Sequence, residues 1–171
     1  MIDLKKYIVN VPDFPTPGIS FKDITPLLND AGAFHYVIEE FSQLVKQLKP
    51  TVILSPEARG FLFGPAVSFN SNVGFVPVRK PGKLPRTVVR KNYSLEYGEN
   101  MLEMHLDAIK PNDRVLIIDD VLATGGTVKA ICDLVEEQGA TVVGLGFLIN
   151  LTSVPKDSGL LKYSTTSLVE Y

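Results

Sequence analysis

The chain has 171 residues, of which 45% are hydrophobic and 21% are charged, a size and balance that suit one domain with a sizeable buried core. Its net charge of −2 argues against binding nucleic acid or an anionic membrane through a global positive field. Cys132 is the single cysteine, the N-terminus lacks the apolar segment of a secretory signal, and no apolar stretch approaches the roughly 18 to 20 residues that cross a bilayer. We therefore expect one cytoplasmic domain, residues 1–171, that inserts into no membrane.

The first half of the chain predicts helices alternating with strands. Residues 34–48 carry apolar side chains at helical spacing and predict an amphipathic helix. Residues 51–55 are a β-branched apolar run, which is typical of a strand buried on both faces. After the loop 56–60, a helix is expected to start near Phe61, and residues 74–79 predict the next strand.

The second half repeats this pattern. Residues 114–119 predict a strand, residues 127–138 a helix ended by Gly139, and residues 141–149 another strand. Such βαβ units require parallel pairing and right-handed crossovers. We therefore expect an α/β fold, with an open, mainly parallel twisted sheet flanked by helices and with ligands at the carboxyl ends of its strands.

The segment between these halves lacks a helix signal. Residues 101–106 alternate and predict a strand with one solvent-exposed face: Leu102, Met104 and Leu106 face one way, and Glu103, His105 and Asp107 the other. The preceding residues 80–99 are basic and rich in turn formers. Loops of that length within a compact domain are usually functional lids or disordered segments, so we expect a mobile flap over approximately residues 80–100.

The strongest local motif is VLIIDDVLATGGT, residues 115–127. Small loop residues let a backbone approach a ligand closely, and the first N–H groups of the following helix favour an anion, so Ala123 to Thr127 are expected to cradle a phosphate. The loop has no lysine, which argues against a nucleoside triphosphatase. Alternatively, Gly125 and Gly126 make only a tight turn and Thr127 caps a helix.

Two acids, Asp119 and Asp120, lie at the carboxyl end of the same predicted strand. Taken alone, they could be turn formers. Beside a phosphate site, two carboxylates can accept hydrogen bonds from the vicinal hydroxyls of a sugar and help to hold Mg²⁺ through water, because hard oxygen ligands suit that ion. The motif therefore predicts a sugar phosphate as ligand.

This motif resembles the phosphoribosyl pyrophosphate signature of the type I phosphoribosyltransferases. Five ordered segments resemble the blocks of the adenine phosphoribosyltransferase family, namely residues 12–28, 57–64, 74–86, 93–98 and 115–127. The resemblance implies the Mg²⁺-dependent conversion of adenine and phosphoribosyl pyrophosphate to AMP and pyrophosphate, a reaction of purine salvage. It also implies a small hood over approximately residues 1–30 and a homodimer.

The family implies roles for individual residues. The 5′-phosphate is expected on Ala123, Thr124, Gly125, Gly126 and Thr127, and the ribose hydroxyls on Asp119 and Asp120. Mg²⁺ is expected on the substrate and water, with both acids nearby but no direct protein ligand. Arg59 is expected against pyrophosphate, flanked by Arg79, Lys80 and Lys83, because guanidinium and ammonium groups match phosphate oxygens. The alternative for this basic run is a solvated loop.

Glu96 matches the glutamate proposed in the family as acid or base toward the purine N7, and Tyr97 is expected to help fix the closed flap. Without the resemblance, Glu96 would be interpreted as a solvated loop acid. The transition state in this family is thought to resemble an oxocarbenium ion, so charge on the leaving pyrophosphate must be stabilised while water is excluded.

Several residues favour adenine over other bases. A backbone C=O and N–H pair within residues 19–22 is expected to recognise adenine, with Phe21 stacking on the ring and Lys22 replacing an arginine often found there. Enzymes for 6-oxopurines have an aspartate at the first position of the phosphate loop, where this chain has Ala123. They also have a lysine in the following strand that reaches the base, whereas residues 140–151 of this chain contain no lysine.

Two other functions share the same fold. The first is a phosphoribosyltransferase for another purine, such as xanthine, against which Ala123 counts. The second is a regulatory protein that binds phosphoribosyl pyrophosphate, but the chain lacks the length and charge of an added DNA-binding module. His35 and His105 are expected to be structural, Cys132 to be a partly or fully buried thiol, and these residues offer no zinc site.

Overall fold

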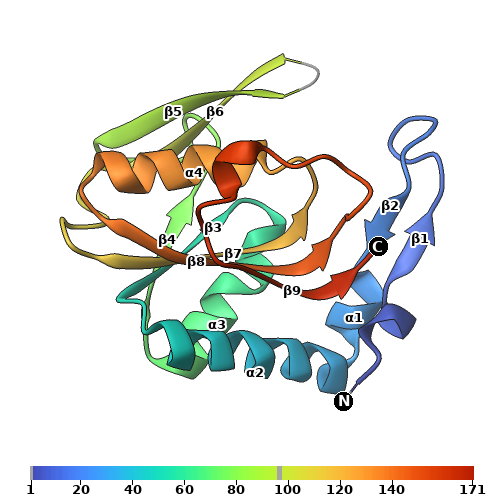
Figure 1. The fold of residues 1–171 in the computed structure, drawn as a ribbon. Coiled ribbons are helices and arrows are strands. Elements are labelled where there is room, and N and C mark those ends of the chain that lie inside the picture. The colour runs from blue at the N-terminus through green and yellow to red at the C-terminus, as the bar shows by residue number, and fades with distance from the viewer. Residues whose placement is uncertain (1, 96–97) are drawn as a thin grey trace.

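A five-stranded parallel sheet forms the centre of the protein, in the strand order β4-β3-β7-β8-β9 (Figure 1). The structure is a computed structural model that describes residues 2–95 and 98–171, without the side chains of residues 94, 95, 98 and 99. The strands of this sheet are β3 (Val52–Pro56), β4 (Gly74–Val78), β7 (Arg114–Leu122), β8 (Thr141–Asn150) and β9 (Thr165–Glu170). The parallel α/β architecture expected from the sequence is confirmed.

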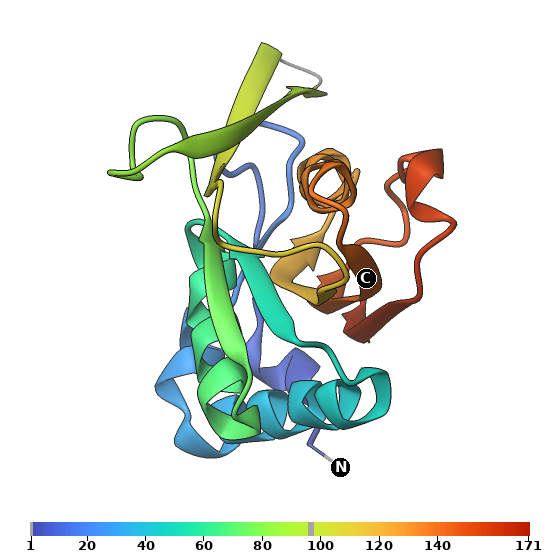
Figure 2. The same ribbon diagram turned by 90° about the vertical axis from the view of Figure 1, so that its left-hand side faces the viewer.

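Helices cover both faces of this sheet (Figures 1 and 2). Helices α2 (Ala31–Leu48) and α3 (Gly64–Ser71) lie on one face and α4 (Gly126–Glu137) on the other. Helix α2 begins earlier than its apolar spacing predicts because the carboxylate of Asp30 accepts a hydrogen bond from the N–H of Ala33 at 2.8 Å. The helix expected near Phe61 is a short 3₁₀ helix η2, Arg59–Leu62, followed by α3.

The core consists of two clusters of buried side chains, one on each face of the sheet. Along β7, Val115 and Ile117 pack beneath α4, whereas Leu116 and Ile118 pack against the α2 and α3 side. All four are fully buried. Because successive side chains of a strand point to opposite faces, those of β7 fill both clusters and fix this strand at the centre of the sheet.

The N-terminal segment forms a small subdomain beyond the carboxyl ends of the central strands (Figure 1). Its elements are η1 (Leu4–Tyr7), the antiparallel pair β1 (Val9–Val11) and β2 (Phe21–Asp23), and the short helix α1 (Thr25–Asn29). We call residues 2–30 the hood. The ring of Tyr171, at the end of β9, lies 4.3 Å from Nζ of Lys22 and so links the hood to the sheet.

The expected flap contains an antiparallel hairpin, β5 (Val88–Leu95) and β6 (Gly98–His105), which projects from the sheet (Figure 2). The sequence predicted only the second strand. Its apolar face is confirmed at Leu102 and Met104, which are buried, but two positions were predicted wrongly: Glu103 is 1% exposed and Leu106 is 48% exposed. The carboxylate of Glu103 accepts hydrogen bonds from Arg90 and Gly82, so it is buried although alternation places it on the exposed face. Among the described residues, no helix combines the length and apolar character needed to cross a membrane.

Candidate active site

The acid pair lies at the carboxyl end of β7, at the centre of the sheet. Asp120 is 4% exposed, and Oδ1 of Asp119 accepts a hydrogen bond from the N–H of Asp120 at 2.8 Å. Burial and the neighbouring charge of Asp120 raise the pKa of Asp119 well above its ordinary value. Burial also raises the pKa of Asp120, although Arg59 opposes that shift. Burial and the adjacent carboxyl group therefore disfavour the charged form of Asp119, and the guanidinium of Arg59 partly offsets this effect.

The predicted phosphate loop follows directly and opens helix α4. Residues Ala123–Thr127, together with Asp119 and Phe147, line a cavity of about 180 Å³. Gly125 precedes the helix with φ 87°, a conformation that residues with a Cβ rarely adopt. The positive end of the α4 dipole thus faces a cavity bounded by an acid and by small residues, as an anion-binding loop beside a polyol site requires.

Arg59 joins the acid pair to the hood. Its Nε lies 2.7 Å from Oδ2 of Asp120, and its guanidinium lies 4.9 Å from the ring centre of Phe21. The next residue, Gly60, lies so close to the acids that a Cβ there would be 3.0 Å from Oδ1 of Asp119. The loop after β3, the acid pair and the hood therefore meet at one place, although the sequence separates them widely.

The remaining predicted basic residues gather around Glu57. Its carboxylate accepts hydrogen bonds from Nε of Arg79 at 2.6 Å and from the N–H of Lys80 at 3.2 Å. Burial raises the pKa of Glu57, but these hydrogen bonds and the charges of Arg79 and Lys83 outweigh it, so the pKa is lowered. Arg79 and Lys80 are thus held beside Glu57 on one side of the loop that carries Arg59.

Glu103 is a buried acid of this region that sequence reasoning missed. It accepts hydrogen bonds from Nε of Arg90 at 2.8 Å and from the N–H of Gly82 at 3.0 Å, and its own backbone pairs with that of Arg79. It therefore connects the flap strand β5 with the basic loop. No sequence signal identifies it, because alternation along β6 indicates an exposed position.

Three other predicted residues have different outcomes. The Nζ of Lys22 donates a hydrogen bond to Oδ1 of Asn10 at 2.6 Å and lies over the ring of Tyr171, so its side chain is engaged by the hood and by the residue after β9. Recognition of adenine by the backbone of Lys22 stays a prediction, and no role in it is assigned to the Lys22 side chain. Glu96 and Tyr97 lie outside the described residues.

Comparisons with known proteins agree with this geometry. Residues 27–167 match the phosphoribosyl transferase domain family. The adenine phosphoribosyltransferase of Mesoplasma florum is 55% identical over 170 residues, covering 99% of this chain and 100% of the relative. The one from Carboxydothermus hydrogenoformans is 51% identical over the same shares of both chains.

Solved structures show the same similarity. The crystal structure of adenine phosphoribosyltransferase from Thermoanaerobacter pseudethanolicus superposes with a TM-score of 0.95 at 48% identity, covering 99% of this chain and 98% of the other. The enzyme from Saccharomyces cerevisiae, complexed with an imino-altritol bisphosphate and adenine, gives a TM-score of 0.90 at 35% identity, covering 96% of each chain. On its sequence, its fold and its acid pair beside a phosphate loop, the chain belongs to the phosphoribosyltransferase family.

Proposed function

We propose that this chain is an adenine phosphoribosyltransferase of purine salvage, which transfers the 5-phosphoribosyl group of phosphoribosyl pyrophosphate to adenine and forms AMP and pyrophosphate. The observation that carries the proposal is the placement of Asp119 and Asp120 directly beside the loop Ala123–Thr127, with Arg59 against the acids. The names of the full-length relatives support adenine as the base.

The substrate would lie along the carboxyl ends of the strands. The N–H groups of Ala123–Thr127 would bind the 5′-phosphate, and Asp119 and Asp120 would accept hydrogen bonds from the ribose hydroxyls. The pyrophosphate would then extend toward Arg59 and Arg79, whose guanidinium groups match phosphate oxygens. The substrate groups are placed in this order because the phosphate loop and the acids lie at the end of β7, whereas Arg59 lies in the neighbouring loop after β3.

Mg²⁺ is part of the proposal. Within residues 2–95 and 98–171, no three or more His, Cys, Asp or Glu side chains are grouped as a metal site. The hard oxygens of Asp119 and Asp120 fit an ion held by the substrate and water, which these carboxylates would contact through water. When bound, Mg²⁺ neutralises charge that develops on the leaving pyrophosphate.

The protein's own groups would complete the chemistry. Arg59 and Arg79 would stabilise the leaving pyrophosphate as its bond to C1′ breaks, while the flap excludes water. Glu96 would exchange a proton with the purine N7, with Tyr97 fixing the closed flap. The base would lie against Phe21 and the backbone of residues 19–22, which the ion pair of Arg59 with Asp120 keeps next to the ribose site.

A product assay tests the proposal. Phosphoribosyl pyrophosphate and Mg²⁺ are supplied with adenine, hypoxanthine, guanine or xanthine, and the Asp119→Asn/Asp120→Asn variant serves as control. AMP formed from adenine alone, and lost in the control, is the expected result. Conversion of an oxopurine instead would overturn the interpretation of Ala123. Binding of phosphoribosyl pyrophosphate without turnover of any base would favour a regulatory protein.

We also propose a homodimer in the cytoplasm. Phe69 on α3 is 91% exposed and Leu62 is 40% exposed, which supports a surface that a second copy could cover. Cys132 is the single cysteine and is free and buried, and a chain that cannot form an intramolecular disulfide supports a reducing compartment. Light scattering that gives the 18.8 kDa mass of one chain would contradict the dimer.

A further inference from the structure

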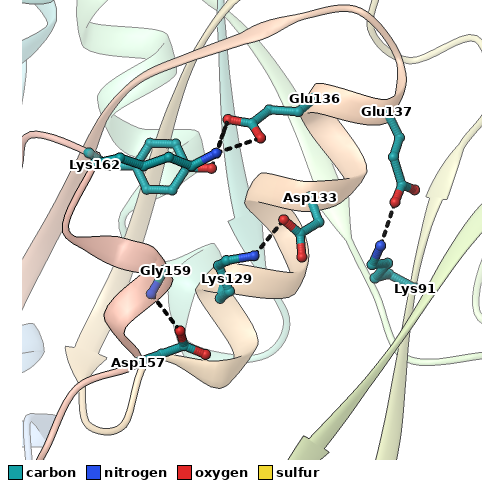
Figure 3. Close-up of polar contacts among 9 residues, drawn as sticks. Lys91, Lys129, Asp133, Glu136, Glu137, Asp157, Gly159 and Lys162 are labelled. Carbon is teal, nitrogen blue, oxygen red and sulfur yellow. Dashed lines mark hydrogen bonds and ion pairs between the residues drawn. The ribbon is translucent and has the colours of Figure 1, made fainter.

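The connection between β8 and β9, residues 151–164, packs against the phosphate loop as well as against α4 (Figure 3). Within it, the short 3₁₀ helix η3 (Ser158–Leu160) ends in Leu160, which is 6% exposed and belongs to the cluster beneath α4. A Cβ atom at Gly125 would collide with Cδ1 of Leu160. The left-handed backbone of the loop at Gly125 therefore leaves the space that Leu160 occupies.

A hydrogen bond joins the same two segments. The N–H of Asp157 donates to the C=O of Thr124 at 2.8 Å, and the carboxylate of Asp157 accepts the N–H of Gly159 at 2.8 Å. The peptide between Thr124 and Gly125 is trans, so its N–H points opposite to its C=O. Because the hydrogen bond from Asp157 holds the Thr124 carbonyl toward the connection, the N–H of Gly125 points away from the connection.

The connection is itself fixed on α4 (Figure 3). Glu136, in the last turns of the helix, accepts hydrogen bonds from Nζ of Lys162 at 2.9 Å and from the hydroxyl of Tyr163 at 2.8 Å. Nearer the loop, Lys129 pairs with Asp133 at 2.6 Å, and its stem fills the position that a Cβ at Gly159 would take. The segment that supports the phosphate loop is therefore anchored at both ends of the helix that the loop opens.

We infer that Leu160 and the backbone N–H of Asp157 are positioning groups for the 5′-phosphate, which hold residues Ala123–Thr127 in their anion-binding shape. The inference rests on the proposed function, since it takes this loop as the 5′-phosphate site. It predicts a specific signature. Phosphoribosyl pyrophosphate and AMP carry a 5′-phosphate, whereas adenine and pyrophosphate do not, so disturbing the connection weakens binding of the first pair only.

Leu160→Ala tests this signature in both reaction directions, with the adjacent Leu161→Ala as control because Leu161 is 85% exposed. In the Leu160 variant, KM should rise roughly tenfold for phosphoribosyl pyrophosphate and AMP, because a displacement of about 1 Å in a site can cost far more than that. KM for adenine and pyrophosphate should stay within about twofold of the control. An equal rise for all four ligands, or no rise for the first pair, would overturn the inference. If the alanine variant does not fold, the same KM values are compared for Leu160→Val.

Gly125→Ala provides a second, independent test. This variant should lose affinity for the two 5′-phosphate ligands, because φ 87° disfavours alanine and its Cβ collides with Leu160. Combining it with Leu160→Ala removes the collision, so the losses of the two single variants should be less than additive in the double variant. Fully additive losses would show that the contact does not shape the loop.

A calorimetric titration with ribose 5-phosphate separates this inference from the proposed function. If the wild-type chain makes no AMP from adenine, the proposed function fails, yet ribose 5-phosphate can still bind to the loop. The wild type and Leu161→Ala should then bind it equally, and Leu160→Ala several-fold more weakly. Equal binding by all three would contradict the inference whatever base the enzyme uses.

Discussion

The guanidinium of Arg59 and the carboxylate of Asp120 form an ion pair with an Nε to Oδ2 distance of 2.7 Å. The same guanidinium lies over the ring of Phe21. One arginine therefore holds together the loop proposed for pyrophosphate, the acids proposed for ribose and the hood proposed for adenine. A change at Arg59 should therefore affect the pyrophosphate, ribose and adenine parts of the proposed site together.

Arg59→Lys keeps the charge but loses the planar fork and the stacking surface. We expect kcat/KM to fall at least about tenfold, which corresponds to about 1.4 kcal/mol of transition-state stabilisation. Steady-state kinetics with both substrates measures this loss. Arg86→Lys is the matched control, since Arg86 pairs with Asp107 on the surface and both side chains are largely exposed. A similar loss in both variants would contradict the role assigned to Arg59.

Asp119→Asn should inactivate the enzyme and yet stabilise its fold. Burial raises the pKa of Asp119, so the charged form is disfavoured in the folded state, and asparagine removes that cost while keeping an oxygen that can accept the N–H of Asp120. A gain of about 1 kcal/mol would raise the midpoint of thermal unfolding by about 2–4 °C in a chain of this size. A lower midpoint at neutral pH would contradict this prediction.

The same substitution should change how stability depends on pH. The pKa of Asp119 is higher in the folded than in the unfolded state, so as the pH rises from about 4 the unfolded chain loses this proton first and wild-type stability falls. The advantage of Asp119→Asn should therefore grow as the pH rises above about 4 and level off once the folded state has lost this proton as well. Asp107→Asn is the control, because a hydrogen bond from Arg86 lowers the pKa of Asp107 and removing it should give no such gain.

Glu103→Gln should affect the pyrophosphate side of the site. The neutral amide weakens the contact with Arg90 and turns one acceptor into a donor, which disturbs the hydrogen bond from Gly82. We expect KM for phosphoribosyl pyrophosphate and pyrophosphate to rise about tenfold, with adenine and AMP much less affected. Asp107→Asn, which breaks an exposed ion pair at the base of the same hairpin, should leave all four values unchanged.

Tyr171→Ala should loosen the hood. The ring of Tyr171 lies 4.3 Å from Nζ of Lys22 and 5.1 Å from Nζ of Lys5, and the alanine variant loses both contacts. KM for adenine should rise several-fold, while that for phosphoribosyl pyrophosphate stays near the wild-type value. Tyr171→Phe keeps an aromatic ring and should behave like the wild type. A phenylalanine variant as weak as the alanine variant would show that the hydroxyl, and not the ring, matters.

The elements predicted from the sequence are those that bury a regular apolar pattern. Strands β3, β7 and β8 are continuous apolar runs, and α2 and α4 carry apolar stripes, so hydrophobic burial alone identifies them. Strand β9 escaped prediction because it lies at the edge of the sheet and only Val169 is buried in it. Strand β5 escaped because polar residues interrupt its apolar ones and because, within the part of the chain that the structure describes, it pairs with β6 alone.

The motif of the site was predicted more completely than its contacts. The acid pair and the phosphate loop are contiguous in sequence, and the structure places Asp119 and the loop along one cavity. The contact of Arg59 with Phe21 and the burial of Glu103 depend on how distant segments pack. Alternation indicates which way a side chain points along a strand, but it contains no information about what covers that side chain.

The strand order β4-β3-β7-β8-β9 has a consequence for how the protein is made. Every residue proposed to contact the substrates directly lies before residue 128, so a ribosome has already synthesised all of them when β8 begins at Thr141. At that stage β7 still lacks the strand that pairs along its other edge, and Leu160 does not yet exist beneath Gly125. Long-range parallel pairing is also slow to form. A nascent chain therefore contains the residues proposed to contact the substrates before it contains β8 and Leu160, and the residues from Thr141 onward complete the support of the site.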